Sequence, residues 1–106
     1  MTRTLVSAPE TARAGEIIEI KAMIAHPMET GYRVDATGKP IPRNIISRFE
    51  CSYDGEVVFS ADLFPAISAN PFIAFSTVAT RSGLISFAWT DDEGKTETAS
   101  VEIKVE

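Results

Sequence analysis

The sequence predicts an all-β fold, an immunoglobulin-like β-sandwich of about seven antiparallel strands. Apolar and polar residues alternate with a period of two along most of the chain, and turn signals separate the alternating runs. No stretch of useful length shows the helical period. The 106 residues fit a single domain, residues 1–106, and 44% of them are hydrophobic, so an ordinary core can form without disulfide staples.

The first three strands are expected at Arg3–Ser7, Ile17–Ile24 and Ile45–Tyr53. The first is short and lies before a proline, and every second residue of the second is apolar. In the third, the residues that share one face and are expected in the core are Phe49, Cys51 and Tyr53.

Four further strands are expected at Val57–Leu63, Phe72–Ala79, Leu84–Thr90 and Thr96–Val105. The pair Asp54-Gly55 before the first of them is a strong signal for a tight hairpin turn. Small residues interrupt the pattern of the second. Trp89 lies on the apolar face of the third, so we expect it in the core rather than on an exposed binding platform.

Two irregular stretches interrupt this pattern. Residues 25–44 contain three prolines and two glycines, which exclude a regular core strand over most of the segment, although a short hairpin could form around Ala36-Thr37-Gly38. A connection of this length in a small domain is typically functional or mobile. The second stretch, Phe64 to Pro71, links two strands with small and apolar residues.

Composition excludes several classes of function. The formal net charge is −5, from ten Lys and Arg against fifteen Asp and Glu, and no basic stripe is present, so we expect no nucleic-acid partner. The apolar runs are far shorter than the roughly 20 residues of a membrane span. The N-terminal residues lack the continuous apolar region of a signal peptide, and none is expected.

The sequence predicts no catalytic residues, no metal site and no cofactor. A thiol relay would have to join His26, the only histidine, to Cys51, the only cysteine, and the alternation places Cys51 inward. An edge-strand thiol that forms a disulfide with another chain is the open alternative for Cys51. The acidic cluster Asp91-Asp92-Glu93 lacks the ligand spacing of a calcium loop and predicts a solvated hairpin turn.

Surface chemistry therefore remains as the candidate function. The two irregular stretches combine apolar and aromatic side chains with arginines, a mixture favoured at protein interfaces. Two interpretations stay open for them: a partner-binding surface, or loops that cover one end of the sandwich. His26 likewise either steers the loop before Pro27 or contacts a partner. The candidate partner-binding residues are His26, Met28, Tyr32, Arg33, Arg43, Phe64, Asn70 and Phe72.

The same irregular stretches carry a resemblance to a known family. His26-Pro27-Met28-Glu29-Thr30-Gly31, Ile41-Pro42-Arg43 and Ser68-Ala69-Asn70-Pro71-Phe72 resemble segments of SoxZ, the Z subunit of the Sox thiosulfate-oxidation carrier complex. Trp89-Thr90-Asp91-Asp92-Glu93-Gly94 is similar as well. The individual motifs are short, but they follow in the same order through nearly the whole chain.

The resemblance implies an immunoglobulin-like subunit without catalytic residues that forms a heterodimer with a SoxY subunit. It implies that the Y subunit holds sulfur intermediates on a cysteine of its glycine-rich C-terminal arm, so Cys51 is not expected to carry sulfur. It further implies transient contacts with the cytochrome, hydrolase and dehydrogenase components of the Sox system, and a periplasmic location reached by export together with the partner. Self-association of the isolated chain is a further expectation. An accessory sandwich of another multiprotein or redox carrier system, and a thiol enzyme that uses Cys51 and His26, are the alternatives.

Overall fold

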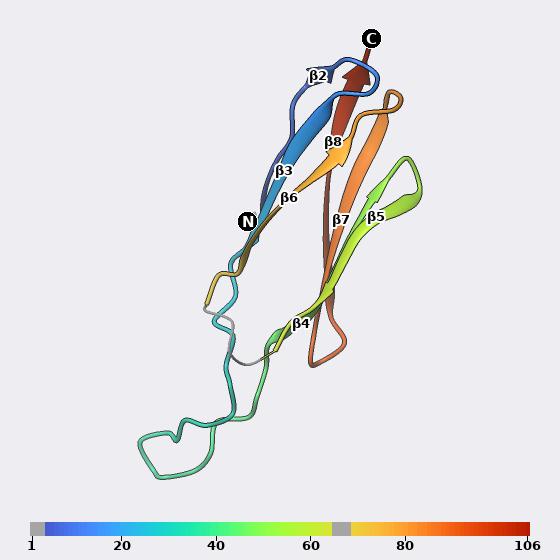
Figure 1. The fold of residues 1–106 in the computed structure, drawn as a ribbon. Helices are drawn as coiled ribbons and strands as arrows, with labels where there is room; N and C mark the ends of the chain where they lie inside the picture. The colour runs from blue at the N-terminus through green and yellow to red at the C-terminus, as the bar shows by residue number, and fades with distance from the viewer. Residues whose placement is uncertain (1–3, 65–68) are drawn as a thin grey trace.

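The computed structural model describes residues 4–64 and 69–106, and these residues form two packed β-sheets without any helix (Figure 1). The fold is the all-β, immunoglobulin-like sandwich that the alternating pattern predicts. Within the described ranges the strands are β1 (Thr4–Ser7), β2 (Thr11–Ala12), β3 (Ile17–Ile24), β4 (Ile46–Tyr53), β5 (Glu56–Asp62), β6 (Phe72–Val78), β7 (Gly83–Asp91) and β8 (Thr96–Val105).

The two sheets contain three and five strands, in the orders β1-β3-β6 and β2-β8-β7-β4-β5. All neighbours are antiparallel except β2 and β8, which are parallel. The seven strands expected from the sequence are present with bounds that differ by a residue or so. The additional strand is β2, a two-residue segment that is too short to show an alternating pattern. The N-terminal segment therefore pairs first with one sheet and then with the other.

The core lies between the sheets and is dominated by aromatic side chains. Trp89, Phe49 and Phe87 are each at most 1% exposed, and the rings of Phe49 and Trp89 lie 5.4 Å apart. Phe59 of β5 and Phe75 of β6 stack across the two sheets with centroids 4.5 Å apart. The sequence expectations that Phe49, Trp89 and the other inward residues of β4 are buried are confirmed. These contacts make the sandwich a rigid base for its loops.

A buried tyrosine ties the connection between β6 and β7 to β4. The hydroxyl of Tyr53 accepts hydrogen bonds from the backbone N–H groups of Thr80 (3.3 Å) and Arg81 (3.2 Å) and donates one to the carbonyl of Arg81. The side chain of Arg81 pairs with Asp54 at 2.5 Å. This corner fixes the end of the sandwich that lies opposite the long loop.

The long loop, residues 25–45, extends beyond the sandwich at the other end (Figure 1). As the prolines predict, it contains no regular strand; only the isolated bridges Glu29–Asn44 and Val34–Pro40 occur in it. The short hairpin expected around residues 36–38 forms, because the Gly38 N–H donates to the Asp35 carbonyl (3.0 Å) and Gly38 adopts a φ of 84°. Of the second irregular stretch, residues 65–68 lie outside the described residues.

Candidate partner-binding surface

The base of the long loop is held by two residues that the sequence analysis placed among the interface candidates. His26 and Asn70 exchange hydrogen bonds: His26 N–H donates to Asn70 Oδ1 (2.9 Å), and Asn70 N–H donates to the His26 carbonyl (2.7 Å). Asn70 adopts a positive φ of 53°, which asparagine tolerates better than most residues. The pair joins the end of β3 to the segment that leads into β6.

His26 also positions Met28. Its Nδ1 accepts a hydrogen bond from the Met28 N–H at 2.9 Å, and both side chains are 4% exposed. Met28 adopts a φ of 53°, and its sulfur lies 3.2 Å from the backbone N–H of Ile46. Met28, one of the partner-binding candidates, is therefore buried in the free chain, because this turn folds its side chain into the core. His26 thus steers the loop through its bond to Met28, which is the first of the two interpretations of this residue in the sequence analysis.

The projecting part of the loop is ordered by ion pairs and a turn. Glu29 and Asn44 exchange backbone hydrogen bonds of 2.9 and 2.8 Å. Arg33 binds the Glu29 carboxylate with two donors, at 3.0 and 2.5 Å, and this pair lowers the pKa of Glu29. The side-chain hydrogen bond from Thr37 lowers the pKa of Asp35, whose carboxylate closes the turn. The loop thus holds its shape with exposed charged groups.

The loop is also tied to the turn between β7 and β8. Arg43 donates to both oxygens of Asp92, at 2.8 and 3.3 Å, and this hydrogen bond holds the pKa of Asp92 below its usual range. The N–H of Ile45 donates to the same carboxylate at 3.2 Å, and Asn44 Nδ2 donates to Glu93 (3.2 Å). The expected solvated turn at residues 91–93 is therefore also an anchor, because Asp92 and Glu93 bind the loop.

Gly31 permits the close approach of the two arms of the loop. A Cβ at this position would lie 3.0 Å from the Cβ of Arg43, and the φ of 89° disfavours other residues. A side chain at Gly31 would require Arg43, which binds Asp92, to shift by a few tenths of an ångström. The glycine of the segment that suggested a family resemblance therefore has a structural role.

The exposed members of the candidate set lie at the loop end of the molecule. Tyr32 is 83% exposed, Phe64 is 65% exposed and Phe72 is 60% exposed. Phe64 follows Leu63, whose N–H donates to the Ser47 carbonyl at the start of β4 (2.8 Å). Arg33 and Arg43 are partly exposed, with 68% and 48% of their side chains accessible, although both are ion-paired.

The structure adds an apolar row that the sequence analysis did not identify. Leu5 of β1 pairs with Met23 of β3, and Met23 pairs with Phe72 of β6, so their side chains line up across the outer face of the three-stranded sheet. Leu5 is 67% exposed. The sequence could have indicated this row, because apolar residues occupy solvent-facing positions of alternating strands. The register that aligns the three strands, however, is not visible in the sequence.

The burial of Cys51 and the absence of a metal-binding cluster in the described residues bear on whether the chain has a catalytic or metal site. Cys51 is fully buried in β4, and burial raises the pKa of its thiol to about 11, so neither a thiol relay with His26 nor an interchain disulfide fits its position. Within residues 4–64 and 69–106 no group of three or more His, Cys, Asp and Glu could hold a metal ion. No helix in this part of the chain is long and apolar enough to cross a membrane.

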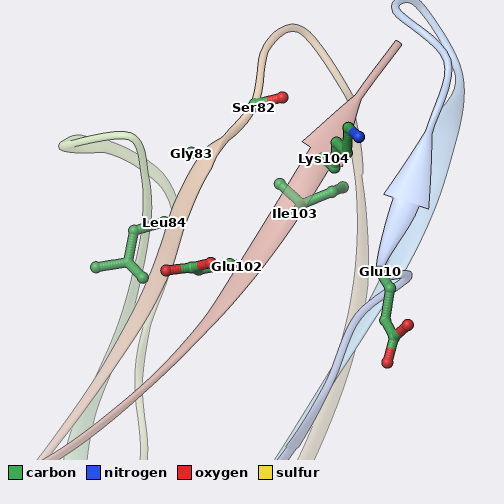
Figure 2. Close-up of a pocket in the computed structure, with 7 residues that line it drawn as sticks. All are labelled: Glu10, Ser82, Gly83, Leu84, Glu102, Ile103 and Lys104. Atoms are coloured by element: carbon green, nitrogen blue, oxygen red, sulfur yellow. The ribbon is translucent and has the colours of Figure 1, made fainter.

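A groove lies at the opposite end of the sandwich, over β7 and β8. Figure 2 shows Leu84 and Glu102 on neighbouring strands of this groove, with Glu10 beyond them, and its volume is about 630 Å³. Its lining includes the polar side chains of Glu10, Ser82, Glu102 and Lys104, which Figure 2 shows pointing in different directions rather than toward one point. None of the candidate residues lines it.

Comparison with known proteins places the chain in a family. The family model described as "Sulphur oxidation protein SoxZ" matches residues 6–102. No curated protein matches the chain by sequence.

Solved structures share its fold. A superoxide reductase (neelaredoxin) from Ignicoccus hospitalis aligns with a TM-score of 0.76 at 20% identity, over 99% of this chain and 81% of that chain. The sulfur carrier protein SoxY from Chlorobium limicola f thiosulfatophilum aligns with a TM-score of 0.69 at 17% identity, over 100% and 81%. At these identities the likeness shows the immunoglobulin-like fold alone.

Proposed function

Because the chain belongs to the family of the sulphur oxidation protein SoxZ, we propose that it is the non-catalytic subunit of a sulfur-carrier heterodimer. Its companion is a SoxY-type subunit that carries sulfur intermediates on a cysteine, and this chain supports the companion and helps it to dock with Sox enzymes. The observation that carries the proposal is the family match over nearly the whole chain, residues 6–102.

The position of the only cysteine supports this division of labour. A carrier thiol has to leave the protein surface and enter the active sites of several enzymes. Cys51 lies in the middle of β4, is 0% exposed and has a thiol pKa of about 11, so almost none of it is thiolate at neutral pH. This position supports the proposal that the sulfur of the complex is bound on the companion.

The loop end of the molecule carries exposed aromatic side chains and an ordered loop, both of which favour binding to another protein. Tyr32, Phe64 and Phe72 are exposed aromatic side chains at one end, and such residues are enriched at the centres of protein interfaces. The ion pairs of the loop hold it in place before binding, which reduces the ordering cost of association. Interfaces of stable complexes bury roughly 1,200–2,000 Å² in total, so we expect the sandwich to contribute to the interface together with the loop.

Two further parts of the proposal concern the setting. We place the chain in the periplasm, exported together with its folded companion, and we expect cytochrome, hydrolase and dehydrogenase components of the Sox system to dock on the dimer transiently. The family resemblance supports both statements. Fractionation of cells that express both subunits, or this chain alone, tests the location: the chain should reach the periplasm only when its companion is present.

Co-expression with a SoxY-type subunit tests the central proposal. We expect both chains to co-elute as a heterodimer in size-exclusion chromatography with light scattering. Phe72→Asp should weaken the complex at least about tenfold, because it places a charge in an aromatic interface. Leu84→Asp is the matched control, since Leu84 is 44% exposed on the other sheet and away from the candidate surface. Chains that elute separately would reject the proposal.

A further inference from the structure

The edge of β6 that faces away from β3 has no partner strand in the described residues. Ala79, the residue after β6, shows which way the backbone groups of β6 point. Its N–H donates to the Glu16 carbonyl (2.8 Å) and its carbonyl accepts from the Gly15 N–H (2.7 Å), so both groups face the segment that leads into β3. Backbone groups alternate in direction along a strand, so the odd-numbered residues of β6 face β3. The residues whose N–H and C=O groups face the free edge are Phe72, Ala74, Ser76 and Val78.

This edge lacks the features that usually prevent strand addition. Proteins protect edge strands with charges, prolines, bulges or short length. The seven residues of β6, Phe72–Val78, include no charged residue, proline or glycine. The edge strand of the other sheet, β5, carries Glu56 and Asp62 and is interrupted by a bulge against β4. The edge strands β1 and β2 have four and two residues.

A lateral groove runs beside the unprotected edge. It has a volume of about 310 Å³ and lies where β5 begins and β6 ends, with Val58, Thr77 and Val78 in its lining. Toward the middle of the strands, the stacked rings of Phe59 and Phe75 close the gap between the sheets. A strand added to β6 would place its inward side chains over this groove, so apolar side chains would be favoured there.

The charges around the groove indicate what kind of strand fits. Glu56 lines the groove and is exposed, and no ion-pair partner for it occurs among the described residues. The cation on the opposite side, Arg81, is already paired with Asp54. A second copy of this chain would add another net charge of −5 and has no basic residue in its own β6. Charge therefore favours a different polypeptide with a basic residue near Glu56.

We propose that the free edge of β6 receives an extended strand of the companion subunit. The strand is apolar along most of β6 and carries one Lys or Arg near Glu56, at the end of β6. Backbone hydrogen bonds to Phe72, Ala74, Ser76 and Val78 supply the attachment, and the lateral groove selects the side chains. This inference rests on the proposed function, because the companion is the SoxY-type subunit.

Amide hydrogen exchange, followed by NMR on the labelled chain, tests the inference directly. In the free chain, the amides of Ala74 and Ser76 should exchange fast, and those of Ile73 and Phe75 slowly, because only the latter are bonded to β3. In the heterodimer, exchange of Ala74 and Ser76 should slow by at least about 100-fold. A heterodimer that forms without this protection overturns the inference and leaves the proposed function intact.

The other outcomes are equally decisive. Protection of Ala74 and Ser76 that grows with the concentration of the isolated chain would show that a second copy is the occupant, and would overturn the proposal. Failure to form any heterodimer overturns the proposed function and this inference together.

A variant adds an independent readout. Ser76→Pro removes an edge N–H without removing a bond to β3, a place where proline is tolerated in edge strands. It should weaken the heterodimer at least about tenfold while the free chain stays folded, whereas Ser76→Val should leave binding unchanged. If Ser76→Pro unfolds the free chain, Glu56→Lys replaces it, because reversing this charge should also weaken binding at least about tenfold. Wild-type affinity in a folded Ser76→Pro chain or in Glu56→Lys contradicts the proposal.

Discussion

Treatment of the folded chain with a thiol reagent tests whether Cys51 could carry sulfur. The reagent reacts with the thiolate, and burial raises the pKa of Cys51 from the usual 9.0 to about 11. Because a pKa higher by two means about 100-fold less thiolate at any pH below 9, the reaction should be at least about 100-fold slower than that of an exposed thiol. The sulfur is also fully buried, so the reagent must wait for the sandwich to open.

The assay is the absorbance change of an aromatic disulfide reagent at pH 8, with and without denaturant. The matched control is the double variant Cys51→Ala with Ser60→Cys, since Ser60 is exposed on the neighbouring strand β5. We expect rapid reaction of the control, slow reaction of the native chain, and rapid reaction of both after unfolding. A native Cys51 that reacts as fast as the control would refute the argument that this chain leaves sulfur chemistry to its companion.

Three further predictions concern the loop and its base. Arg43→Met should loosen the loop, and faster amide exchange at Ile45 should show this. The wild type should lose the same stabilisation as the pH falls from about 3.8 through the lowered pKa of Asp92. A carboxyl group whose pKa is lowered by folding stabilises the fold only while it is ionised, and protonation removes this contribution. His26→Leu should cost about 1–3 kcal/mol in urea unfolding, since the buried Met28 N–H loses its acceptor, while His26→Asn, which keeps an acceptor near the Nδ1 position, should recover most of it; equal losses would contradict this role. Tyr53→Phe should cost about 1–3 kcal/mol in the same measurement, because two backbone donors lose their partner; an unchanged midpoint would show that the corner does not stabilise the fold.

Most of the fold could be predicted because it depends on a local pattern. Alternation identifies strands and the side chains that face the core, and Trp89, Phe49 and Cys51 are buried as it predicts. β2 escaped prediction because two residues show no period. Proline content correctly excluded regular structure from residues 25–44.

The candidate site was less predictable because it depends on contacts between distant residues. Met28 is a partner-binding candidate in the sequence, but its positive φ and the hydrogen bond to His26 fold its side chain inward in the free chain. Arg43 and Asp92, 49 residues apart, meet only in the folded chain. The sequence of β6 shows an uncharged run, but only the order of strands in the sheet shows that this run forms an unpaired edge.

The most direct test of the account is to purify the chain with its SoxY-type companion, load the complex with thiosulfate in the presence of the Sox enzymes, and measure the intact mass of each subunit. The account predicts a stable heterodimer in which the companion alone gains the mass of bound sulfur species and this chain keeps its own mass. Sulfur bound to Cys51, or a chain that never associates with the companion, would contradict it.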